Sequence, residues 1–520
     1  MSGKLNESWL SSTLSNYGLL ALRIGSMLVL TRSLFLGLNP EQYGFWALLW
    51  SIFSYTLLLD FGFGTAVQKW TSQSSAQGDW QRYGQLLSSL LLSYGFMGGL
   101  LALISFPLAQ GLPQWFQFGS DPTPFQQLFL VFGVGSGLLF PTGMAAEMLR
   151  GLGQLRLRNR IQAQGVLLQT GGSLLLLHFW PNLMALTLWT LLSTLLTNAW
   201  LFRKAWQGLP PQFKLGRPSL SLLKEVAGFS FFAWLITLSN LVIFRSDQLV
   251  IGTTLGVSAI AGYQIAGRVA DLFRQLTTQL HDYLGPLAAR AHAQGDQAMI
   301  HDTLLKSARW VSLLAVLMGL PLAWVLPDLL QLWLNLNDPT LVLCARLLLF
   351  SMFVQVSLRS SSTQILLMCQ REQALMWGGM AEAVLNLSLS LFLAPRLGVL
   401  GVALGTVLPN LVMAVFFQLP LVQKASGISP LNYFLRASGR AWLAGILASL
   451  LVWPLWLQLA SLTPLLRLLL GGTAAGSLSL AFLLLLGLTK AEKTSLLLRL
   501  SKPLKVKKNP NHALLESNSL

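Results

Sequence analysis

Stretches of about twenty predominantly apolar residues recur along the whole chain, and this repetition restricts the fold more than any other feature. A segment of that length crosses the hydrocarbon core of a bilayer as an α-helix. The runs are too long and too continuous for the strands of a membrane barrel. The sequence therefore predicts an all-α, polytopic membrane protein with about fourteen spanning helices, near 12–36, 43–67, 84–110, 125–149, 161–180, 183–206, 226–252, 256–284, 306–326, 340–368, 374–394, 398–422, 439–459 and 464–489.

Composition leads to the same class. Hydrophobic residues make up 53% of the chain and charged residues only 10%, with a mean hydropathy of +0.60. A soluble domain carries roughly 25% charge, so an ordinary soluble enzyme is excluded. A disordered chain is excluded too, because apolar residues dominate throughout.

The net charge of +17 would suggest nucleic acid in a soluble protein. Here the basic residues gather in every second connection between spans, whereas the alternate connections contain one basic residue, Arg396. The positive-inside rule explains that distribution. We therefore expect no nucleic-acid partner, and we expect both termini to be cytoplasmic.

A weak internal repeat divides the chain. Residues 148–151 end the fourth span much as residues 368–371 end the tenth. This pattern predicts two six-helix lobes related by a pseudo-twofold, parallel repeat, followed by a C-terminal helix pair. The expected divisions are an N-terminal lobe (1–206), a cytoplasmic linker (207–225), a C-terminal lobe (226–424), accessory helices (425–489) and a basic cytoplasmic tail (490–520).

The sequence contains no pattern typical of an enzyme. The two cysteines, Cys344 and Cys369, lie in apolar sequence and indicate neither a disulfide framework nor a metal site. A phosphate-binding loop, a catalytic triad and a metal cluster are all missing from the pattern. We therefore expect a non-enzyme with no metal and no cofactor, although a proton or sodium ion could be coupled to its activity.

Ionisable residues inside the spans carry most of the functional information, because each costs about 2.5–3.5 kcal/mol on insertion scales. Arginine is in excess among them, which predicts an anion-binding cavity, since guanidinium groups bind phosphate at two points. The set comprises Arg23, Arg32, Asp60, Arg245, Asp247, Arg268, Asp271, Arg274, His281, Arg346, Arg359 and Glu382.

The eighth span has a polar stripe. Steps of three and four residues place six polar side chains on one helical face. The stripe faces either a hydrated central cavity or an internal salt bridge of Asp271 with Arg268 or Arg274. One ion pair would not need six polar positions, so the cavity is the favoured interpretation. The stripe comprises Gln264, Arg268, Asp271, Gln275, Thr278 and Asp282.

In the first span, Arg23 lies near mid-membrane and is a candidate ligand for an anion. Arg32 follows nine residues later, half a turn out of phase on a straight helix. The two converge on one cavity only if the helix bends near Gly25. Otherwise Arg32 snorkels towards the membrane surface.

The remaining charges leave alternatives open. Arg245 and Asp247 could neutralise each other, and Arg359 could pair with Glu382. Asp60 is either a coupling residue or the partner of Arg23 or Lys69. The candidate substrate-binding residues are Arg23, Arg32, Arg245, Arg268, Arg274, Arg359 and Gln264, and the candidate coupling residues are Asp60, Asp247, Asp271 and Glu382.

An ordered series of short segments resembles the oligosaccharide (O-antigen and polysaccharide) flippases of the multidrug/oligosaccharidyl-lipid/polysaccharide exporter superfamily. The resemblance extends from residue 12 to about residue 422 and keeps its order. It is carried by residues 23–28, 31–34, 36–37, 41–44, 58–64, 247–252, 255–256, 262–263, 286–288, 295–296, 384–387, 395 and 397–401. Residues 370–371 and the segment around Pro181 depart from the pattern.

The resemblance implies a transporter that moves polyprenyl-pyrophosphate-linked oligosaccharides across the bacterial inner membrane by alternating access, driven by an ion gradient or the membrane potential. Within the matching segments, Arg23, Arg32, Asp60 and Asp247 are carried over as candidate residues. The implied partners are membrane lipid, the lipid-linked glycan, a polysaccharide polymerase and glycosyltransferases. A peptidoglycan-precursor flippase and a multidrug or metabolite exporter remain the alternatives.

Overall fold

The computed structural model confirms the helical membrane fold. It describes residues 2–61, 63–227, 231–278, 294, 296–369, 371–489 and 492–494, and every regular element among them is a helix. Within these ranges, eleven helical segments are long and apolar enough to cross a membrane. The other three expected spans, around 40–77, 155–179 and 257–278, are helical but contain more polar residues.

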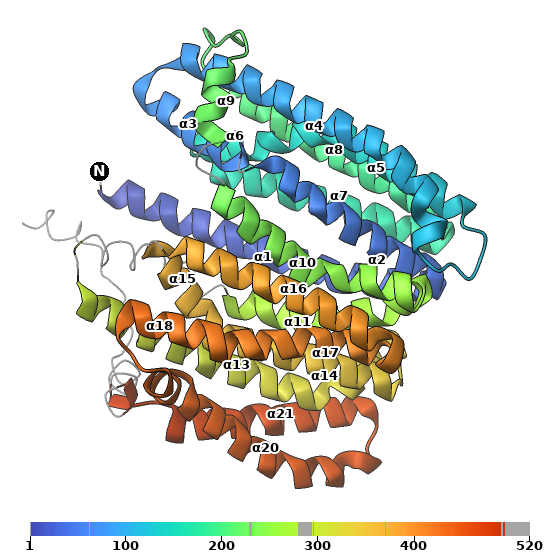
Figure 1. Ribbon diagram of the computed structural model, residues 1–520, viewed down its shortest axis with the longest axis vertical. Helices are drawn as coiled ribbons and strands as arrows, with labels where there is room; N and C mark the ends of the chain where they lie inside the picture. The colour runs from blue at the N-terminus through green and yellow to red at the C-terminus, as the bar shows by residue number, and fades with distance from the viewer. Residues whose placement is uncertain are drawn as a thin grey trace, which may run out of the picture.

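The helices gather into two groups, which Figure 1 shows one above the other. The first group comprises α1 (Ser2–Gly37), α2 (Pro40–Ser54), α3 (Phe63–Gln77), α4 (Trp80–Trp115), α5 (Thr123–Leu139), α6 (Ala145–Gly151), α7 (Leu155–Phe179) and α8 (Leu183–Gln207). The second comprises α10 (Phe231–Thr254), α11 (Val257–Thr278), α13 (Gln297–Leu334), α14 (Pro339–Val354), α15 (Ser361–Met368), α16 (Glu372–Leu397), α17 (Val399–Val412) and α18 (Leu419–Ser426).

Shorter elements complete the chain. The connecting helix α9 (Leu220–Ala227) joins the two groups, and α19 (Pro430–Tyr433), α20 (Arg440–Gln458) and α21 (Pro464–Phe482) follow the second group. Helix α21 packs against α13 and α20. The divisions expected at residues 206, 225, 424 and 489 remain predictions.

Several spans are interrupted by a change of helix type. In the second span, the 3₁₀ turn η1 (Tyr55–Asp60) is followed by Phe61 with a left-handed φ of 45°. The fourth span is interrupted by the 3₁₀ turn η2 (Phe140–Met144), and the tenth by the π-helical turn η4 (Gln355–Ser360). Such interruptions leave backbone groups out of the regular ladder and are frequent at functional sites. The apolar runs in the sequence predict continuous helices at these positions.

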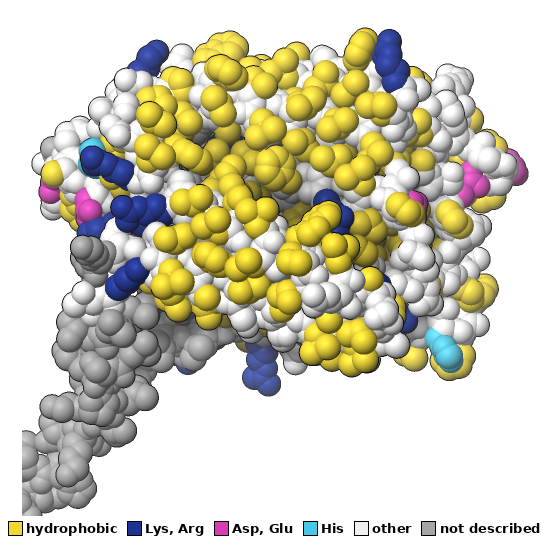
Figure 2. Space-filling view, turned by 90° about the horizontal axis from the view of Figure 1, so that it is seen from below, with side chains coloured by type: hydrophobic (Ala, Val, Ile, Leu, Met, Phe, Trp, Pro, Cys, Tyr) yellow, Lys and Arg dark blue, Asp and Glu magenta, His cyan; other side chains and the backbone are white. Residues whose placement is uncertain are grey.

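The surface matches a lipid environment. Figure 2 shows one face covered largely by hydrophobic side chains, with most of the charged side chains near its two ends. Many large apolar residues on the spans are exposed, among them Leu92, Phe96 and Phe416 at 64%, 72% and 76%. Exposed apolar surface on this scale would be unstable in water and is expected of helices that face lipid.

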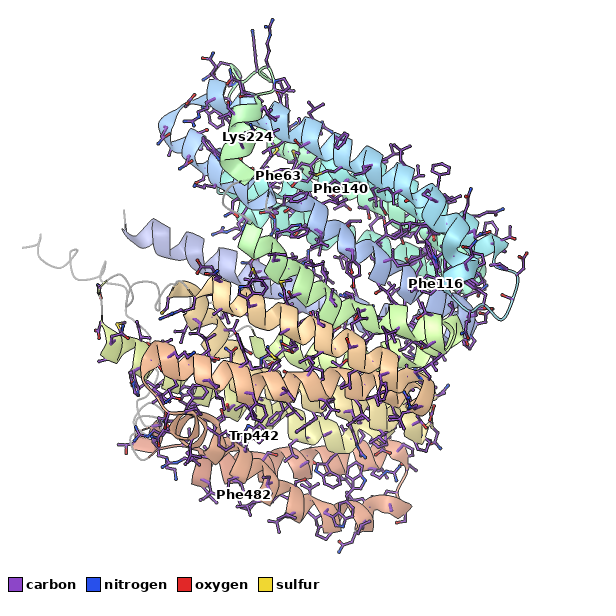
Figure 3. All side chains as sticks on the ribbon, in the orientation of Figure 1. Phe63, Phe116, Phe140, Lys224, Trp442 and Phe482 are labelled. Atoms are coloured by element: carbon purple, nitrogen blue, oxygen red, sulfur yellow. The ribbon has the colours of Figure 1, made fainter. Side chains whose placement is uncertain are left out.

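The two groups converge at one end of the molecule. Figure 3 shows Phe116 at that end and Lys224 at the other, and we call them the Phe116 end and the Lys224 end. At the Phe116 end, the amide of Gln117 donates to the Gly252 carbonyl at 3.1 Å, and the amide of Val257 donates to the Gln117 carbonyl at 3.0 Å. The Gln117 carboxamide also donates to the Thr253 carbonyl at 3.1 Å. These bonds join the first group to the α10–α11 turn.

Close packing of α2 on α11 depends on a glycine at this end. A Cβ atom on Gly44 would lie 2.0 Å from the Val257 carbonyl oxygen. We expect Gly44→Ala to separate the two helices and open the Phe116 end. Spin labels at Thr123→Cys and Ser258→Cys, in a background without Cys344 and Cys369, would then report longer distances by double electron–electron resonance.

The matched control is Gly25→Ala in α1, where an added Cβ would meet nothing within 4 Å. It should leave the label distances at the wild-type values. Unchanged distances in Gly44→Ala would show that the two groups do not depend on this contact for closure.

Candidate functional site

A central cavity of about 270 Å³ lies between the two groups of helices. Helices α1, α2 and α7 of the first group supply most of its wall, and α11 of the second group supplies Gln264 and Arg268. Arg23 faces the same space from α1. Two arginines that are 245 positions apart in sequence therefore line one cavity, together with Ser26, Met27, Leu30, Thr31, Leu34, Tyr43, Trp46, Ala47, Trp50, Val166, Gln169 and Thr170.

Neighbouring polar groups hold Arg268 in place. The Gln264 carboxamide lies one turn earlier on α11. With its oxygen turned towards Arg268, it accepts from Nη2 at 3.2 Å and from Nε at 3.3 Å. The Gln264 amide nitrogen then faces the Gln248 side chain of α10 at 3.0 Å. Nη1 of Arg268 lies 3.6 Å from the Met27 sulfur of α1. Among the described residues no carboxylate forms an ion pair with this guanidinium, so its charge is available to an anion.

Arg23 is held by an amide side chain of the first group. Its Nη2 donates to Oε1 of Gln162 in α7 at 3.2 Å. A neutral amide orients the guanidinium without cancelling its charge, and no carboxylate lines the cavity within the described part of the chain. The arrangement is suited to binding an anionic group between two guanidinium groups from different helices.

The other candidate arginines lie elsewhere. Arg32 donates through Nη1 to the Leu332 carbonyl of α13 at 3.0 Å and does not line the central cavity, because α1 continues as one helix between positions 23 and 32. Arg245 lies within electrostatic range of Arg268, Asp271 and Arg274. Arg274 lies 3.5 Å from Asp271, which is one of the two salt bridges that the stripe suggested.

The stripe on α11 is only partly visible. Gln264 is buried and Arg268, Asp271 and Gln275 are half-buried. Asp282 and His281 lie outside the described residues. The described part of the stripe therefore supplies both a cavity wall, at Gln264 and Arg268, and a salt bridge, at Asp271 and Arg274.

Asp60 lies in a second space, the N-terminal cavity, whose volume is about 560 Å³. The Tyr94 hydroxyl of α4 donates to Asp60, and the Gly64 amide donates to it at 3.3 Å. These contacts replace the pairing with Arg23 or Lys69 that the sequence left open. Glu147 lines the same cavity and is bound by Arg150 and Arg158 at 3.5 and 3.4 Å. Of the two carboxylates in this cavity, Asp60 is therefore the one without an arginine partner among the described residues.

Asp247 is buried in an uncharged network of the second group. The Tyr263 hydroxyl donates to its Oδ2, and the Thr406 hydroxyl lies 3.1 Å from the same oxygen. Asn386 donates to Thr406 at 3.2 Å. The other oxygen, Oδ1, has no hydrogen-bond partner within the described part of the chain. Asp247 therefore does not neutralise Arg245, and a buried oxygen remains free to accept a proton or a small cation.

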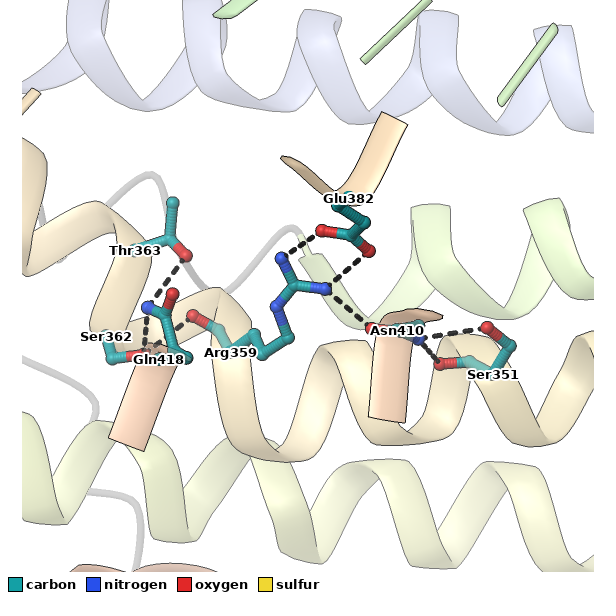
Figure 4. A network of polar contacts seen from close by, with 7 residues as sticks. All are labelled: Ser351, Arg359, Ser362, Thr363, Glu382, Asn410 and Gln418. Atoms are coloured by element: carbon teal, nitrogen blue, oxygen red, sulfur yellow. Dashed lines mark hydrogen bonds and ion pairs between the residues drawn. The ribbon is translucent and has the colours of Figure 1, made fainter. Parts of the chain in front are cut away.

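The C-terminal cavity, of about 760 Å³, contains Arg274, Arg359 and Glu382 in its wall. Figure 4 shows the Arg359 guanidinium facing the Glu382 carboxylate. Nη2 donates to Oε2 at 2.5 Å and Nη1 to Oε1 at 2.7 Å. Nη1 also donates to Asn410 at 2.7 Å. The pairing of Arg359 with Glu382 that the sequence suggested is present.

Sequence reasoning missed the neutral partners. Tyr94, Gln162, Tyr263 and Thr406 hold the candidate charges, but isolated hydroxyl and amide side chains in apolar spans leave no spacing signal. The break at Phe61 was also missed, although the glycines at 62 and 64 were a signal that a continuous helix was doubtful there. No group of three metal-ligating side chains occurs among the described residues.

Comparisons with solved structures place the fold. The chain is similar to a lipid II flippase MurJ in an inward closed conformation, with a TM-score of 0.67 and 13% identity over 91% of this chain and 99% of the other. An inward-facing multidrug resistance transporter of the MATE family has a TM-score of 0.67 and 15% identity over 77% and 95%. A transporter of the same superfamily from Pyrococcus furiosus has a TM-score of 0.56 and 14% identity over 80% and 95%.

Sequence comparison supplies the family. No curated protein matches the chain. Residues 30–335, more than half of the sequence, match a family described as polysaccharide biosynthesis protein. This range includes α2, α7 and α11 with Arg268 of the central cavity, whereas Arg23 and most of α1 lie before its first residue. The chain is a multi-pass membrane protein with the fold of the MurJ and MATE transporters, and it belongs to the polysaccharide biosynthesis protein family.

Proposed function

We propose that this protein is a flippase that moves polyprenyl-pyrophosphate-linked oligosaccharides across the bacterial inner membrane. The observation that carries the proposal is the central cavity, where Arg23 and Arg268 face one space from the two groups of helices. A pyrophosphate is a doubly charged anion with several acceptor oxygens, and guanidinium groups bind such oxygens in pairs. Membership of a polysaccharide biosynthesis family supports a glycan as the cargo.

The mechanism is alternating access. The pyrophosphate binds between Arg23 and Arg268 while the Phe116 end is closed by the Gln117 hydrogen bonds. The polyprenyl chain stays in lipid, because burying it in a polar cavity would lose its transfer free energy. Separation of α2 from α11 at the Phe116 end then releases the glycan on the other side. The protein makes and breaks no covalent bond in this cycle, so it acts as a transporter and not as an enzyme.

The distribution of basic residues supports an orientation with the Lys224 end and both termini in the cytoplasm. In that orientation the Phe116 end faces the periplasm. A polysaccharide polymerase would take the product there, and cytoplasmic glycosyltransferases would supply the substrate.

The test is a flipping assay in proteoliposomes. The purified chain is reconstituted with a fluorescent polyprenyl-pyrophosphate oligosaccharide, and a membrane-impermeant quencher reports how much of it reaches the outer leaflet. Without the protein, the quencher should reach only the half of the probe that lies in the outer leaflet. With the protein present, we expect the fluorescence to fall below that half. If the protein flips none of a panel of lipid-linked glycans and instead exports a cationic dye, the proposal is overturned in favour of the exporter.

One observation bears on each alternative. An exporter of cationic compounds needs acidic groups in its cavity, whereas the described lining of the central cavity contains two arginines and no carboxylate. A peptidoglycan-precursor flippase would share the pyrophosphate site. The same assay with a lipid-linked muramyl peptide separates it from an oligosaccharide flippase.

We propose that Asp247 couples transport to a proton or sodium gradient and that Asp60 is the second candidate. Neither has an arginine partner among the described residues, and Oδ1 of Asp247 lacks a hydrogen bond. The surrounding carboxylate, hydroxyl and amide oxygens suit a hard cation or a proton. We expect Asp247→Asn to leave flipping but to abolish its acceleration by an imposed gradient.

The matched control is Asp121→Asn, which removes an exposed carboxylate that binds Thr123 in a loop at the Phe116 end. It should retain the full response to the gradient. A response retained by Asp247→Asn and lost by Asp60→Asn would transfer the coupling role to Asp60.

A further inference from the structure

The C-terminal cavity has a lining unlike that of the other two. It lies within the second group, between α10, α11, α15, α16 and the segment around Gln418. Four carboxamides and several hydroxyls face it, from Asn240, Gln355, Gln364, Gln418, Thr237, Ser239, Ser360 and Thr363. Its volume of about 760 Å³ lies within the range of sites that enclose small organic ligands.

Three of these carboxamides are unused. Within the described part of the chain, no side-chain hydrogen bond engages Asn240, Gln355 or Gln364, although Gln418 donates to Ser362 and Thr363 at 2.9 and 3.2 Å. Each carboxamide offers both an acceptor oxygen and two donor hydrogens. They come from three different segments of the second group, α10, η4 and α15. Such a set can bind neighbouring hydroxyl groups of a sugar.

The charges of the cavity are already satisfied. Arg359 is bound to Glu382 and Asn410, as Figure 4 shows, and Arg274 is bound to Asp271 and lies over the Phe244 ring, 5.3 Å from its centroid. Neither guanidinium is therefore offered to a ligand carboxylate. The cavity presents hydrogen-bonding groups and ring faces from Phe244 and Phe417, but little uncompensated charge.

The N-terminal cavity provides a contrast. Its lining is mainly aromatic and aliphatic, with the carboxylates of Asp60 and Glu147. Its carboxamide, Asn198, already donates to Thr142 at 2.8 Å. Of these two cavities, only the C-terminal one contains carboxamides without a side-chain hydrogen bond among the described residues.

The C-terminal cavity is also placed to receive what is attached to the pyrophosphate. Arg274 in its wall follows Arg268 of the central cavity by six residues on α11. Six residues of α-helix correspond to roughly 9 Å along the axis, towards the Lys224 end. The sugars that follow the one bonded to a phosphate held at Arg268 could reach this space.

We propose that the C-terminal cavity is the glycan subsite of the transporter and that it takes sugars without net charge. This inference rests on the proposed flippase function. The sugar units beyond the first hydrogen-bond to Asn240, Gln355 and Gln364, and a ring face packs on Phe417. A uronic acid in the same position would lose its hydration without gaining a cation, which penalises acidic glycans.

The test uses the full chain in proteoliposomes with three polyprenyl-pyrophosphate probes. They carry one N-acetylglucosamine, a neutral tetrasaccharide, and the same tetrasaccharide with one hexose replaced by its uronic acid. The variant is Asn240→Leu with Gln364→Leu, and the control is Gln458→Leu at the exposed end of α20. Size-exclusion profiles and melting temperatures check that each variant folds.

We expect the wild type to flip the neutral tetrasaccharide at least tenfold faster than the acidic one. Loss of two sugar hydrogen bonds should slow the neutral tetrasaccharide about tenfold in the double variant, with the monosaccharide unchanged within about twofold. A further variant, Gln355→Lys, supplies a free cation and should raise the rate of the acidic probe relative to the neutral one. This gain does not depend on the double variant folding.

Equal slowing of the monosaccharide and the tetrasaccharide, or equal wild-type rates for the neutral and acidic probes, would overturn the glycan subsite while leaving the flippase intact. Failure of the wild type to flip any of the three probes would instead contradict the proposed function, and the subsite would be rejected with it.

Discussion

Replacing Arg268 with glutamine is expected to slow the flipping of a polyprenyl-pyrophosphate glycan by roughly 10- to 100-fold. A hydrogen bond to a charged group contributes about 1.5–3 kcal/mol, and every 1.4 kcal/mol corresponds to a factor of ten. Glutamine retains a donor and much of the side-chain length but removes the charge. The same change at Arg23 should have an effect of similar size, because both guanidinium groups line the central cavity.

Initial flipping rates in proteoliposomes, over a range of glycan concentrations, measure the effect. The control is Arg396→Gln at the exposed end of α16, where the guanidinium binds the Phe392 carbonyl and stacks on the Phe392 ring. It should flip at the wild-type rate. Flipping at the wild-type rate by a correctly folded Arg268→Gln variant would show that the pyrophosphate does not bind in the central cavity.

Removal of Glu382 is expected to destabilise the protein by about 3–5 kcal/mol. The Glu382 side chain is 6% exposed and its two oxygens both accept from Arg359, whose side chain is 14% exposed. Glu382→Ala would leave the guanidinium among the helices with Asn410 as its main remaining partner. The free energy of unfolding, measured by steric trapping in bilayers or bicelles, reports the loss.

The double variant Arg359→Met with Glu382→Met removes both charges and should recover most of this stability, since replacing a buried ion pair by apolar groups is often neutral. The exposed pair of Lys306 with Asp302, at 62% and 59% exposure, provides a matched comparison. Asp302→Ala should cost less than about 1 kcal/mol. A Glu382→Ala variant as stable as Asp302→Ala would mean that water already solvates the Arg359 guanidinium.

The sequence predicts the helical fold well because lipid imposes a simple length rule. Apolar runs appear wherever a helix crosses the bilayer, and the helices end close to the expected positions. Differences arise at the ends, where α4 extends to Trp115 and α13 begins at Gln297. Polar residues at these helix ends lie beyond the hydrocarbon core, so hydropathy does not mark them.

The candidate site is only partly predictable. Arg23, Gln264 and Arg268 could be found because charge and amide groups are rare in spans and because four-residue steps place two of them on one face. The sequence could not show that Arg23 lines the same cavity as Arg268 while Arg32 binds the Leu332 carbonyl. That arrangement depends on how α1 packs against α7, α11 and α13. The same holds for Asp60, whose partner Tyr94 comes from a separate helix.

The hydrogen bonds of Gln117 have a thermodynamic consequence for the transport cycle. Two of the three use only main-chain atoms, and the third ends on a main-chain carbonyl. Each bond contributes a net free energy of about 0.5–1.5 kcal/mol, so the three together favour the closed arrangement by roughly 2–4 kcal/mol. A resting population of open molecules near one per cent follows, and a cargo needs to favour the open state by only a few kcal/mol to reverse that balance. Side-chain substitutions in this loop other than at Gln117 would change the population little, whereas proline at Val257, which removes a main-chain donor, would raise it severalfold.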